Sequence, residues 1–537
     1  MWLPRFDLTR PYQLRQIRPL GLGVVAGGGP TLGYSALEHF LGDLEALRVA
    51  APLSDALMQR YLEIWPVPAE GAFFYLDNRR KVNYSSYPIA AGKISASDRV
   101  LGATTQLFLH DADGHCLHMH SGPGDDHMTR TLEPFAQRFV PLIGRDKVRG
   151  IVADQEMRSV ALFLALEAMD HLGFVTIAPT PTPKQEAALE VQGIFVPYLR
   201  DAESGELTHW VAHAHTLLQD RRKGLSYPCE LTLVVDCRSG LPGRLVPVLH
   251  NLREEELPVE VPHTVYVDRW ESQERVFRDM RACQNLDVNY GHKKVLVPNR
   301  RVERKRDELQ HKLHTWDKRV ATAQRKTHEY AEQIATLEQK ARQKQFETQE
   351  QCIALHQRSR EATTSRKQQR LLVQKERLAA KGQVQQIRFQ ERRRRFAAKQ
   401  RTWQQKLIER QSTRKKMAQA LQELEDRPFY DLDLEKDNLM TYLRMAGENA
   451  HRFVQERYFA GTFLEKVDEA TMVRLVYNRP GWVQQQGAYL HVRLLGYDDP
   501  ELQTAAAQAC QRVNQAQVDL TGGHRLRMTV VDKIPSC

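Results

Sequence analysis

The sequence predicts an α/β protein with a mixed core, a long inserted helical hairpin and a small α+β lobe at the C-terminal end. Three observations predict this class. Short apolar strand patterns alternate with amphipathic helical patterns in residues 67–186. Residues 301–427 are rich in Lys, Arg, Glu and Gln and contain no proline. After Pro428, helical and strand patterns are mixed again.

Length, charge and cysteine usage narrow the class of protein. The 537 residues are enough for several domains with at least one large buried core. The formal net charge of +11 suits a polyanionic partner, of which nucleic acid is the usual one. No stretch approaches the ~18–20 uninterrupted apolar residues of a membrane helix, and charged residues interrupt Met1–Leu20, which lacks the apolar core of a secretory signal. The seven scattered cysteines contain no Cys-x-x-Cys, so we expect a reducing, cytoplasmic location.

Residues 1–66 predict an N-terminal helical region. Apolar residues recur at helical spacing in Tyr34–Leu47 and Pro52–Ile64. The glycine-rich stretch 21–30 lacks the Gly-Lys-Ser/Thr ending of a phosphate loop, and no strand pattern precedes it. We therefore expect a flexible connector there.

Residues 67–186 predict the first part of the core, with three strands of antiparallel type, a helix, a strand, a helix and a strand. The Asp-Gly pair before the third strand is typical of a hairpin turn. In order, the elements are Ala72–Asp77, Thr104–His110, Cys116–His120, Met128–Val140, Val148–Asp154, Met157–Leu172 and Phe174–Ala178. The first and fourth strands each end in an aspartate.

The next two segments predict an insertion and a return to the core. Residues 187–262 alternate short β-like runs with Gly, Pro and Asp turns, which predicts a β-rich insertion. Residues 263–300 return to the core, and Val265–Met280 within them predicts one helix.

The remaining segments predict a basic coiled-coil hairpin and a C-terminal lobe. Apolar residues in 301–427 keep alternating spacings of four and three, as in a coiled coil. The stretch 361–366 is poor in helix formers and predicts a reversal between two arms of about 55 residues, each roughly 80 Å long. Residues 428–537 predict an α+β region, in which strands 489–495 and 525–531 flank a helix.

Asp77, Asp154 and Glu274 are the candidate metal-binding carboxylates. Phosphodiester cleavage can use two divalent metals about 3.5–4 Å apart, which activate the attacking oxygen and stabilise the leaving one. Mg²⁺ requires oxygen ligands, so such a site gathers carboxylates. Taken alone, each residue has an ordinary explanation as a turn former, a helix cap or an ion-pair partner. Their joint occurrence in this order of elements favours a metal site.

The segment around Glu274 resembles the Tyr-Arg-Glu-Lys signature of bacterial insertion-sequence transposases. In that family a Tyr, an Arg and a Lys surround the catalytic Glu on one helix and contact DNA phosphates. Tyr266, Arg269 and Glu274 match these roles. The Arg-to-Glu gap is one residue longer than usual, which leaves Glu271 as an alternative acid. Arg281 occupies the Lys position, and its planar fork is not equivalent to a Lys point charge.

Further motifs are similar to those of an unclassified subgroup of these transposases. They are Arg-Trp-x-x-Gln-Glu at 269–274, Leu-Asp at 286–287 and Val-Pro-Asn at 297–299. The resemblance covers most of residues 34–531. It implies a ribonuclease-H-like catalytic core, which carries an Asp on its first strand, an Asp at the end of its fourth and an acid on a later helix.

The resemblance also implies an activity and its partners. We expect a DDE transposase that acts as a homodimer on double-stranded DNA, both transposon ends and target, near the nucleoid of a bacterium. The three carboxylates are expected to hold two Mg²⁺ ions, for which Mn²⁺ can substitute. The residues expected to orient the DNA end are Tyr266, Arg269 and Arg281.

Two other functions and one open question remain at this stage. One alternative is a catalytically inactive DNA-binding scaffold that acts through its coiled coil. The other is a ribonuclease-H-like nuclease that cleaves DNA without joining it. No helix-turn-helix pattern precedes Asp77, so we expect the N-terminal helices and the coiled coil, or a part upstream, to recognise DNA.

Four further clusters each have an ordinary and a functional interpretation. Two groups of histidines are either ordinary strand residues, which the pattern favours, or zinc ligands. The pair Asp111 and Asp113 is an alternative source of the first acid. The run Arg392–Arg395 is either a solvated coiled-coil face, the favoured interpretation, or a phosphate-binding patch. The histidines are His115, His118 and His120 in one hairpin and His209, His213 and His215 in another stretch.

Overall fold

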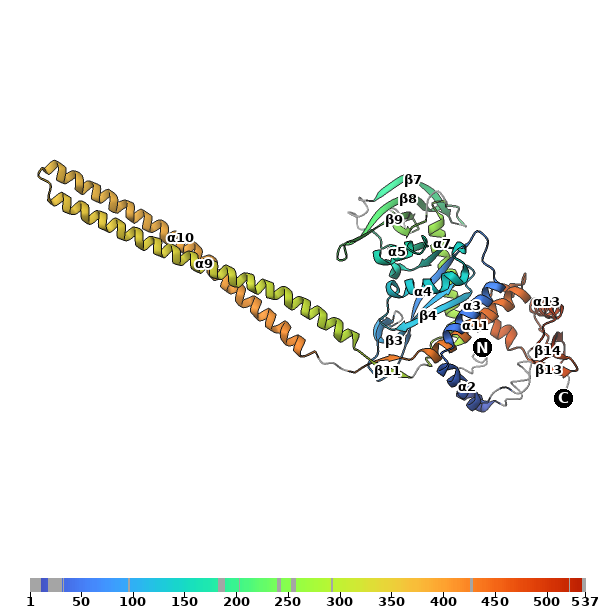
Figure 1. Ribbon diagram of the computed structural model, residues 1–537. Coiled ribbons are helices and arrows are strands. Elements are labelled where there is room, and N and C mark those ends of the chain that lie inside the picture. The colour runs from blue at the N-terminus through green and yellow to red at the C-terminus, as the bar shows by residue number, and fades with distance from the viewer. Residues whose placement is uncertain are drawn as a thin grey trace. The chain divides into compact units, whose positions relative to one another are not determined.

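The computed structural model divides the chain into two compact units (Figure 1). The sheet unit comprises residues 1–296 and 430–537, and the helical unit comprises residues 297–429. No helix in the described part of the chain is long and apolar enough to cross a membrane. The residues described are 11–17, 31, 33–94, 97–181, 189–201, 203–238, 243–252, 257–290, 293–424, 428–520 and 522–533.

The sheet unit is built on a ten-stranded mixed sheet, so the predicted α/β class is confirmed. Strand β1 lies between β3, which is antiparallel to it, and β5, which is parallel to it. Strand β4 pairs with β3 in antiparallel direction, and β6 is parallel to β5. A short strand, β2, pairs with the start of β3 and was not predicted. The bounds are β1 Ala72–Val82, β2 Ala91–Ile94, β3 Arg99–His110, β4 Cys116–Pro123, β5 Val148–Ala153 and β6 Gly173–Ile177.

Helices α4 (Met128–Ile143) and α5 (Val160–Glu167) cover one face of this sheet. Phe135 and Phe139 of α4 are fully buried against the core formed with Phe74 of β1, and each such side chain contributes roughly 1.5–3 kcal/mol. Helix α5 is shorter than predicted. The Ser159 hydroxyl caps its start by accepting from the Leu162 backbone N–H, and two residues with positive φ, Asp170 and His171, follow its end.

The predicted β-rich insertion extends the main sheet instead of forming a body of its own. Its four strands pair in antiparallel sequence, and β10 pairs with β6 of the core. His250 of β10 lies opposite Val175 of β6 in this pairing. The bounds are β7 Glu190–Arg200, β8 Leu207–Asp220, β9 Leu225–Asp236 and β10 Arg244–His250.

The single helix predicted for Val265–Met280 is helical throughout, but it changes geometry in the middle. Helix α7 (Val261–Arg269) is followed by a π-helical turn, η6 (Trp270–Glu274), and then by α8 (Arg275–Gln284). Helix α7 packs its residues Val265 and Tyr266 against the second face of the sheet.

The N-terminal helices and α11 (Glu435–Tyr458) pack around β1, β3 and β4. Lys81 of β1 and Asp437 of α11 form an ion pair at 2.6 Å with exposures of 0% and 1%. Asp437 also accepts from the Tyr290 backbone N–H at 2.8 Å. The helices before the sheet are η2 Pro11–Gln16, α2 Tyr34–Ala46 and α3 Ala50–Ile64. The glycine-rich connector predicted at 21–30 lies outside the described residues.

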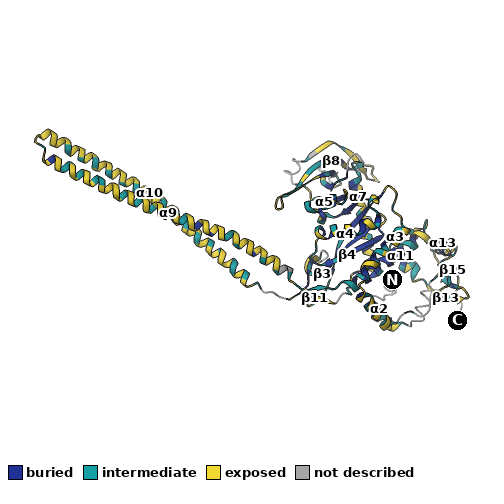
Figure 2. Ribbon diagram, in the orientation of Figure 1, coloured by how far each residue is buried: buried dark blue, intermediate teal, exposed yellow. Residues whose placement is uncertain are grey.

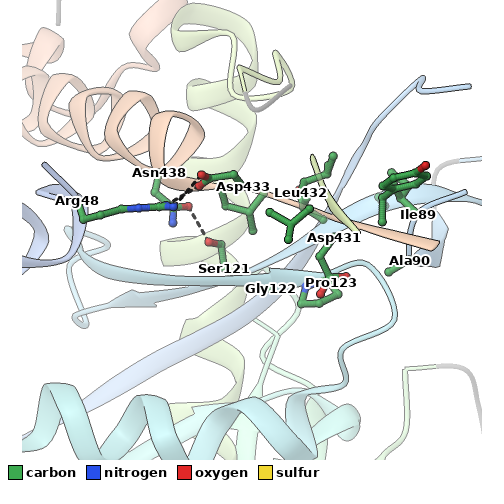
Figure 3. A pocket seen from close by; sticks show the side chains of 15 residues that line it. Arg48, Ile89, Ala90, Ser121, Gly122, Pro123, Asp431, Leu432, Asp433 and Asn438 are labelled. Carbon is green, nitrogen blue, oxygen red and sulfur yellow. Dashed lines mark hydrogen bonds and ion pairs between the residues drawn. The ribbon is translucent and has the colours of Figure 1, made fainter. Parts of the chain in front are cut away.

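Where the chain re-enters the sheet unit, β12 (Phe429–Leu432) pairs with β11 (Lys294–Val297). A hollow of about 340 Å³ lies between this segment, the sheet and the α2–α3 connection (Figure 3). Arg48 spans its edge with a bidentate pair to Asp433 at 2.6 and 2.8 Å. None of the three predicted acids is among the residues that line the hollow.

The C-terminal lobe contains the predicted βαβ arrangement. Strands β14 and β15 are parallel and joined by α13, whose first turn is capped by Asp499. Strand β13, antiparallel to β14, was not predicted. The bounds are η7 Phe463–Lys466, α12 Glu469–Met472, η8 Val473–Tyr477, β13 Gly481–Gln486, β14 Tyr489–Leu495, α13 Pro500–Ala516 and β15 Arg525–Val531.

The helical unit is an antiparallel pair of long helices, α9 (Arg300–Arg360) and α10 (Ser365–Gln422). Most residues of its two helices are exposed or only partly buried (Figure 2). Glu338 accepts from Arg393 at 2.5 Å, and the Ala341 carbonyl accepts from Gln386 at 3.0 Å. The residue numbers of facing positions therefore increase along α9 as they decrease along α10, as expected for antiparallel helices. A Cβ on Gly382 would lie 2.8 Å from Thr348, which shows how closely the helices approach there.

Replacing Lys81 with methionine is expected to destabilise the sheet unit by on the order of 3–5 kcal/mol, because it leaves the Asp437 carboxylate buried without its cation. The double variant Lys81→Met/Asp437→Leu should recover most of that loss. Urea denaturation followed by circular dichroism measures both. Arg60→Met, which breaks the exposed pair with Glu63, is the control and should leave the midpoint nearly unchanged. A Lys81→Met protein as stable as wild type would contradict the assignment.

Candidate active site

Asp77 lies on β1, and Asp154 directly follows the end of β5, the strand next to β1. Strands β1 and β5 are parallel, with Leu76 opposite Ala153, and the two aspartates are the next residues of each chain segment. Neighbouring strands are about 4.8 Å apart. Leu76 and Ala153 face the core under α4, so alternation directs both carboxylates to the face covered by α7.

Both aspartates also have local structural roles. The Asp77 carboxylate is 28% exposed and accepts from the Asn78 backbone N–H at 2.9 Å. Asp154 caps the short helix η4 (Gln155–Met157) by accepting from the Glu156 backbone N–H at 2.9 Å. The ordinary capping role is therefore present at Asp154, and it orients the carboxylate.

The surroundings of the two carboxylates disfavour their charged forms. The pKa of Asp77 is raised to about 6, chiefly by burial and also by the charges of Asp154 and Glu156, against the lowering effect of Arg269. Burial also raises the pKa of Asp154, where the Glu156 N–H lowers it and the Glu156 charge raises it. Like charges held together in a partly buried position are relieved by a cation with oxygen preference, such as Mg²⁺ or Mn²⁺.

Arg269 and Tyr266, both on α7, lie next to the aspartate pair. Arg269 Nη1 is 3.7 Å from Asp77 Oδ1, and its guanidinium lies over the Tyr266 ring at 5.4 Å from the centroid. Burial raises the pKa of Tyr266, and the neighbouring Arg269 lowers it. The structure therefore brings four of the six predicted site residues together.

Glu274 and Arg281 are placed differently. Glu274 is exposed at the end of η6, and among the described residues no hydrogen bond or ion pair joins it to either aspartate. Among the described side chains of this turn, that of Gln273 is buried, and its Nε2 lies 3.4 Å from His110 Nδ1. The alternative acid Glu271 has a side chain outside the described part of the structure.

Arg281 lies farther along the same helical run, on α8. It is exposed, and its Nε is 3.9 Å from Asp287, which also pairs with Arg79 of β1. Burial, together with the neighbouring charge of Arg281, lowers the pKa of Arg79 to about 9. Because Arg79 shares the β1 face of Asp77, Arg281 extends the positive charge along that face.

Glu156 is a further acid of this cluster that was not predicted. Its carboxylate accepts from Asn78 Nδ2 at 3.0 Å and lies 3.8 Å from Arg80 Nη1. Its charge raises the pKa of both aspartates, so it belongs to the same electrostatic cluster. The only hint in the sequence was its position two residues after Asp154.

The alternative first acid, Asp111, is part of the turn between β3 and β4. Its Oδ1 accepts from the backbone N–H groups of Asp113 and His115, and its Oδ2 lies 2.7 Å from His115 Nδ1. His115 is stacked on Trp65 at 3.9 Å and reaches Glu456 through Nε2 at 2.9 Å. This cluster joins the hairpin to α11.

No family model matches the chain, and no curated protein matches it at a significant level.

Asp77→Asn is expected to stabilise the metal-free protein at pH 7.5 by on the order of 1–2 kcal/mol. The pKa of the Asp77 carboxyl rises on folding to about 6. Such a group begins to cost stability above its unfolded pKa of about 4 and costs the full amount above about pH 6. Asparagine carries no charge and avoids this cost. Urea midpoints measure the gain. Adding Mg²⁺ should stabilise wild type and leave Asp77→Asn unchanged. The control is Asp98→Asn, at an exposed pair with Lys93. Equal Mg²⁺ stabilisation of wild type and Asp77→Asn would count against the cation site.

His115 should make stability depend on pH above neutrality. Burial lowers the pKa of His115, but the carboxylates of Asp111 and Glu456 raise it to about 9. A raised histidine pKa contributes stability below about pH 6.5 that is lost as the pH passes through 9, on the order of 2–3 kcal/mol. The urea-midpoint difference between wild type and His115→Gln should therefore shrink between pH 6 and 9.5. His171→Gln, at an exposed site, is the control. A constant difference would show that His115 is neutral throughout.

Proposed function

We propose that this chain is a metal-dependent DNA transposase with a ribonuclease-H-like core. The observation that carries the proposal is the placement of Asp77 and Asp154, which directly follow the paired residues Leu76 and Ala153 of two parallel strands. The order of elements supports it: three antiparallel strands, a helix, a strand, a helix and a strand, with the first strand between the second and the fourth. This order is what the resemblance implies.

The π-helical turn supports the match to the Tyr-Arg-Glu-Lys signature. The gap from Arg269 to Glu274 is one residue longer than in the signature, and η6 spans Trp270–Glu274. A π-turn is closed by a hydrogen bond between residues five apart, where an α-turn uses four. The extra residue is therefore absorbed within one turn, and Glu274 follows Arg269 much as the signature Glu follows its Arg.

The residues of the aspartate cluster suit the proposed chemistry. Asp77 and Asp154 would hold Mg²⁺, with Glu274 as third acid or Glu156 in its place. Two bound Mg²⁺ ions supply activation of a water or a 3′-hydroxyl and stabilisation of the leaving oxygen. Arg269 presents a guanidinium that can bind a phosphate through two N–H groups, and Tyr266 limits its movement.

The helical unit supports DNA as the partner. Residues 301–427 contain 33 Lys and Arg against 16 Asp and Glu, a net charge of +17 in a chain whose total is +11. The other parts of the chain are thus net acidic. Long-range attraction to a phosphate backbone is concentrated in the hairpin. Arg388, Arg392 and Arg395 line one hollow of its surface together with Lys344.

Exposed apolar residues on the hairpin support the proposed homodimer. Phe346 and Ile353 are seven residues apart on α9 and 63% and 52% exposed, and Ile387 on α10 is 56% exposed. A seven-residue spacing places side chains on one helix face, where a second copy can cover them.

One observation favours the inactive scaffold as a second candidate. Glu274 is exposed, and its described contacts do not include the aspartates. A chain that has lost catalysis would retain the basic hairpin and still bind DNA.

The first test is Mg²⁺-dependent cleavage of DNA that carries the sequences flanking this gene. Asp154→Asn should lower the cleavage rate at least about 100-fold, since asparagine keeps an oxygen for the cap but removes the ligand charge. Asp146→Asn, an exposed residue before β5, is the matched control and should cleave as wild type.

Three outcomes separate the candidates. The variants Glu274→Gln and Glu156→Gln identify the third acid. The one whose cleavage rate falls to that of Asp154→Asn has lost a metal ligand. Cleavage without strand transfer would indicate a nuclease. DNA binding without cleavage, equal in wild type and Asp154→Asn, would overturn the catalytic proposal in favour of the scaffold.

A further inference from the structure

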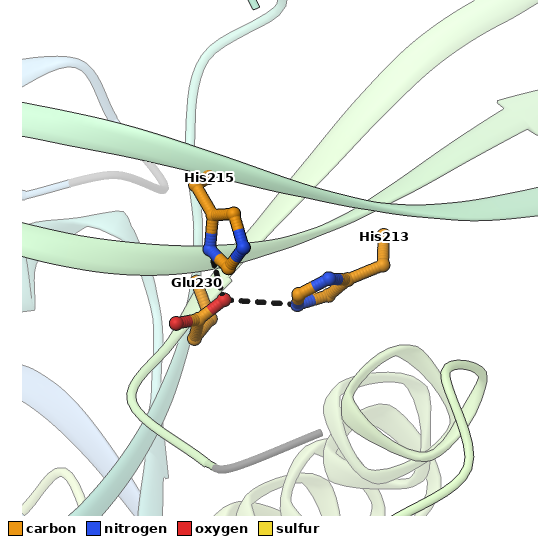
Figure 4. Close-up of side chains that lie close together, drawn as sticks. All are labelled: His213, His215 and Glu230. Carbon is orange, nitrogen blue, oxygen red and sulfur yellow. Dashed lines mark ion pairs between the residues drawn. The ribbon is translucent and has the colours of Figure 1, made fainter. Parts of the chain in front are cut away.

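A second group of potential metal ligands lies in the β-rich part of the sheet. His213 and His215 of β8 converge on Glu230 of β9 (Figure 4). His213 Nε2 is 2.9 Å and His215 Nδ1 is 2.5 Å from the same carboxylate oxygen. One potential ligand atom from each residue lies within 4.8 Å of the other two.

The register of β8 and β9 explains the convergence. His215 is directly opposite Glu230. His213 is two positions from His215 on β8, so its side chain lies on the same face, diagonal to Glu230. From the sequence, zinc ligation is one interpretation of these histidines, and ordinary strand residues are the favoured one. The carboxylate that completes the set comes from the neighbouring strand, fifteen residues farther along the chain.

The cluster is separate from the aspartate pair. Glu230 is opposite His250 of β10, His250 is opposite Val175 of β6, and Val175 is opposite Val152 of β5. This row reaches β1 at Tyr75, two residues before Asp77. Four strand spacings therefore separate the row at Glu230 from β1, roughly 20 Å.

The donors differ in kind from those of the aspartate pair. Two imidazoles and one carboxylate suit Zn²⁺, whereas Mg²⁺ prefers oxygen ligands alone. A tetrahedral zinc site with bonds of about 2.0–2.1 Å separates its ligand atoms by roughly 3.3 Å. The ligand atoms that contact Glu230 lie within 3 Å of it, so small side-chain rotations would reach this spacing.

Burial is graded across the cluster in a way that suits a metal site. His213 is 6% exposed, while the side chains of His215 and Glu230 are 38% and 31% exposed. The inner ligand is fixed by packing, and the outer two border solvent. A metal can enter from that side, and its fourth position would be available to water.

We propose that His213, His215 and Glu230 form a Zn²⁺ site that ties β8 to β9. The site does not depend on the proposed DNA chemistry. It would stabilise the sheet edge that the insertion adds to the core, because a bound metal favours the folded state in which its ligands are assembled.

The test is a zinc titration of the full chain after chelator treatment, in competition with a chromophoric chelator and with excess Mg²⁺ present. We expect one Zn²⁺ per chain at this site. His215→Asn and Glu230→Gln should each weaken zinc binding at least about 100-fold. His209→Asn is the matched control, because it removes a histidine from the same face of β8 and leaves the cluster intact. Circular dichroism verifies the folding of each variant.

A second measurement covers variants that fold poorly. Zinc should raise the urea midpoint of wild type and of His209→Asn, and leave that of His215→Asn unchanged. Co²⁺ bound to wild type should show the visible absorption of four-coordinate cobalt, lost in Glu230→Gln. The proposal is overturned if wild type binds no zinc, if excess Mg²⁺ displaces it, or if His209→Asn weakens binding as much as His215→Asn does.

Discussion

The charged face of β1 is the constraint on which the sheet unit depends. Asp77, Arg79 and Lys81 are every second residue of the strand and therefore share this face. Each carries a charge that is costly to bury alone. Their partners come from later segments: Arg269 on α7, Asp287 after α8 and Asp437 on α11. Since Asp437 follows the whole helical unit, the chain must return to β1 to neutralise Lys81. One strand thus fixes where three distant segments dock.

The same arrangement explains how two like charges persist at Asp77 and Asp154. The residues beside them, Leu76 and Ala153, are fully buried in the core under α4 and hold both strands in register. The repulsion between the carboxylates is therefore balanced by apolar packing on the opposite face of the sheet. Such a pair costs stability locally, and the proposed cation would offset that cost, which is a common relation between stability and function.

Local sequence patterns predicted the individual helices and strands. They could not predict the features that depend on pairing between distant elements. Apolar periodicity was sufficient for β1, β5 and the long helices, and so the two strand-end aspartates were found from the sequence. The union of β10 with β6 was not predictable, because it depends on the pairing of distant strands. Glu230 was missed for the same reason. The π-turn shifts the helical phase by one residue, so regular periodicity could not predict that Gln273 is buried and Glu274 exposed.

Because α9 and α10 are antiparallel and in register, the length of the hairpin can change in evolution while the sheet unit stays the same. Facing residues are matched across the pair, as Glu338 is with Arg393, and the strands at its base, β11 and β12, pair with each other. Deleting or duplicating a matched seven-residue repeat in both arms would change the reach by about 10 Å and keep the seam in phase. The ends would still meet at the same place. Selection can therefore lengthen or shorten this arm without altering the sheet from which it emerges.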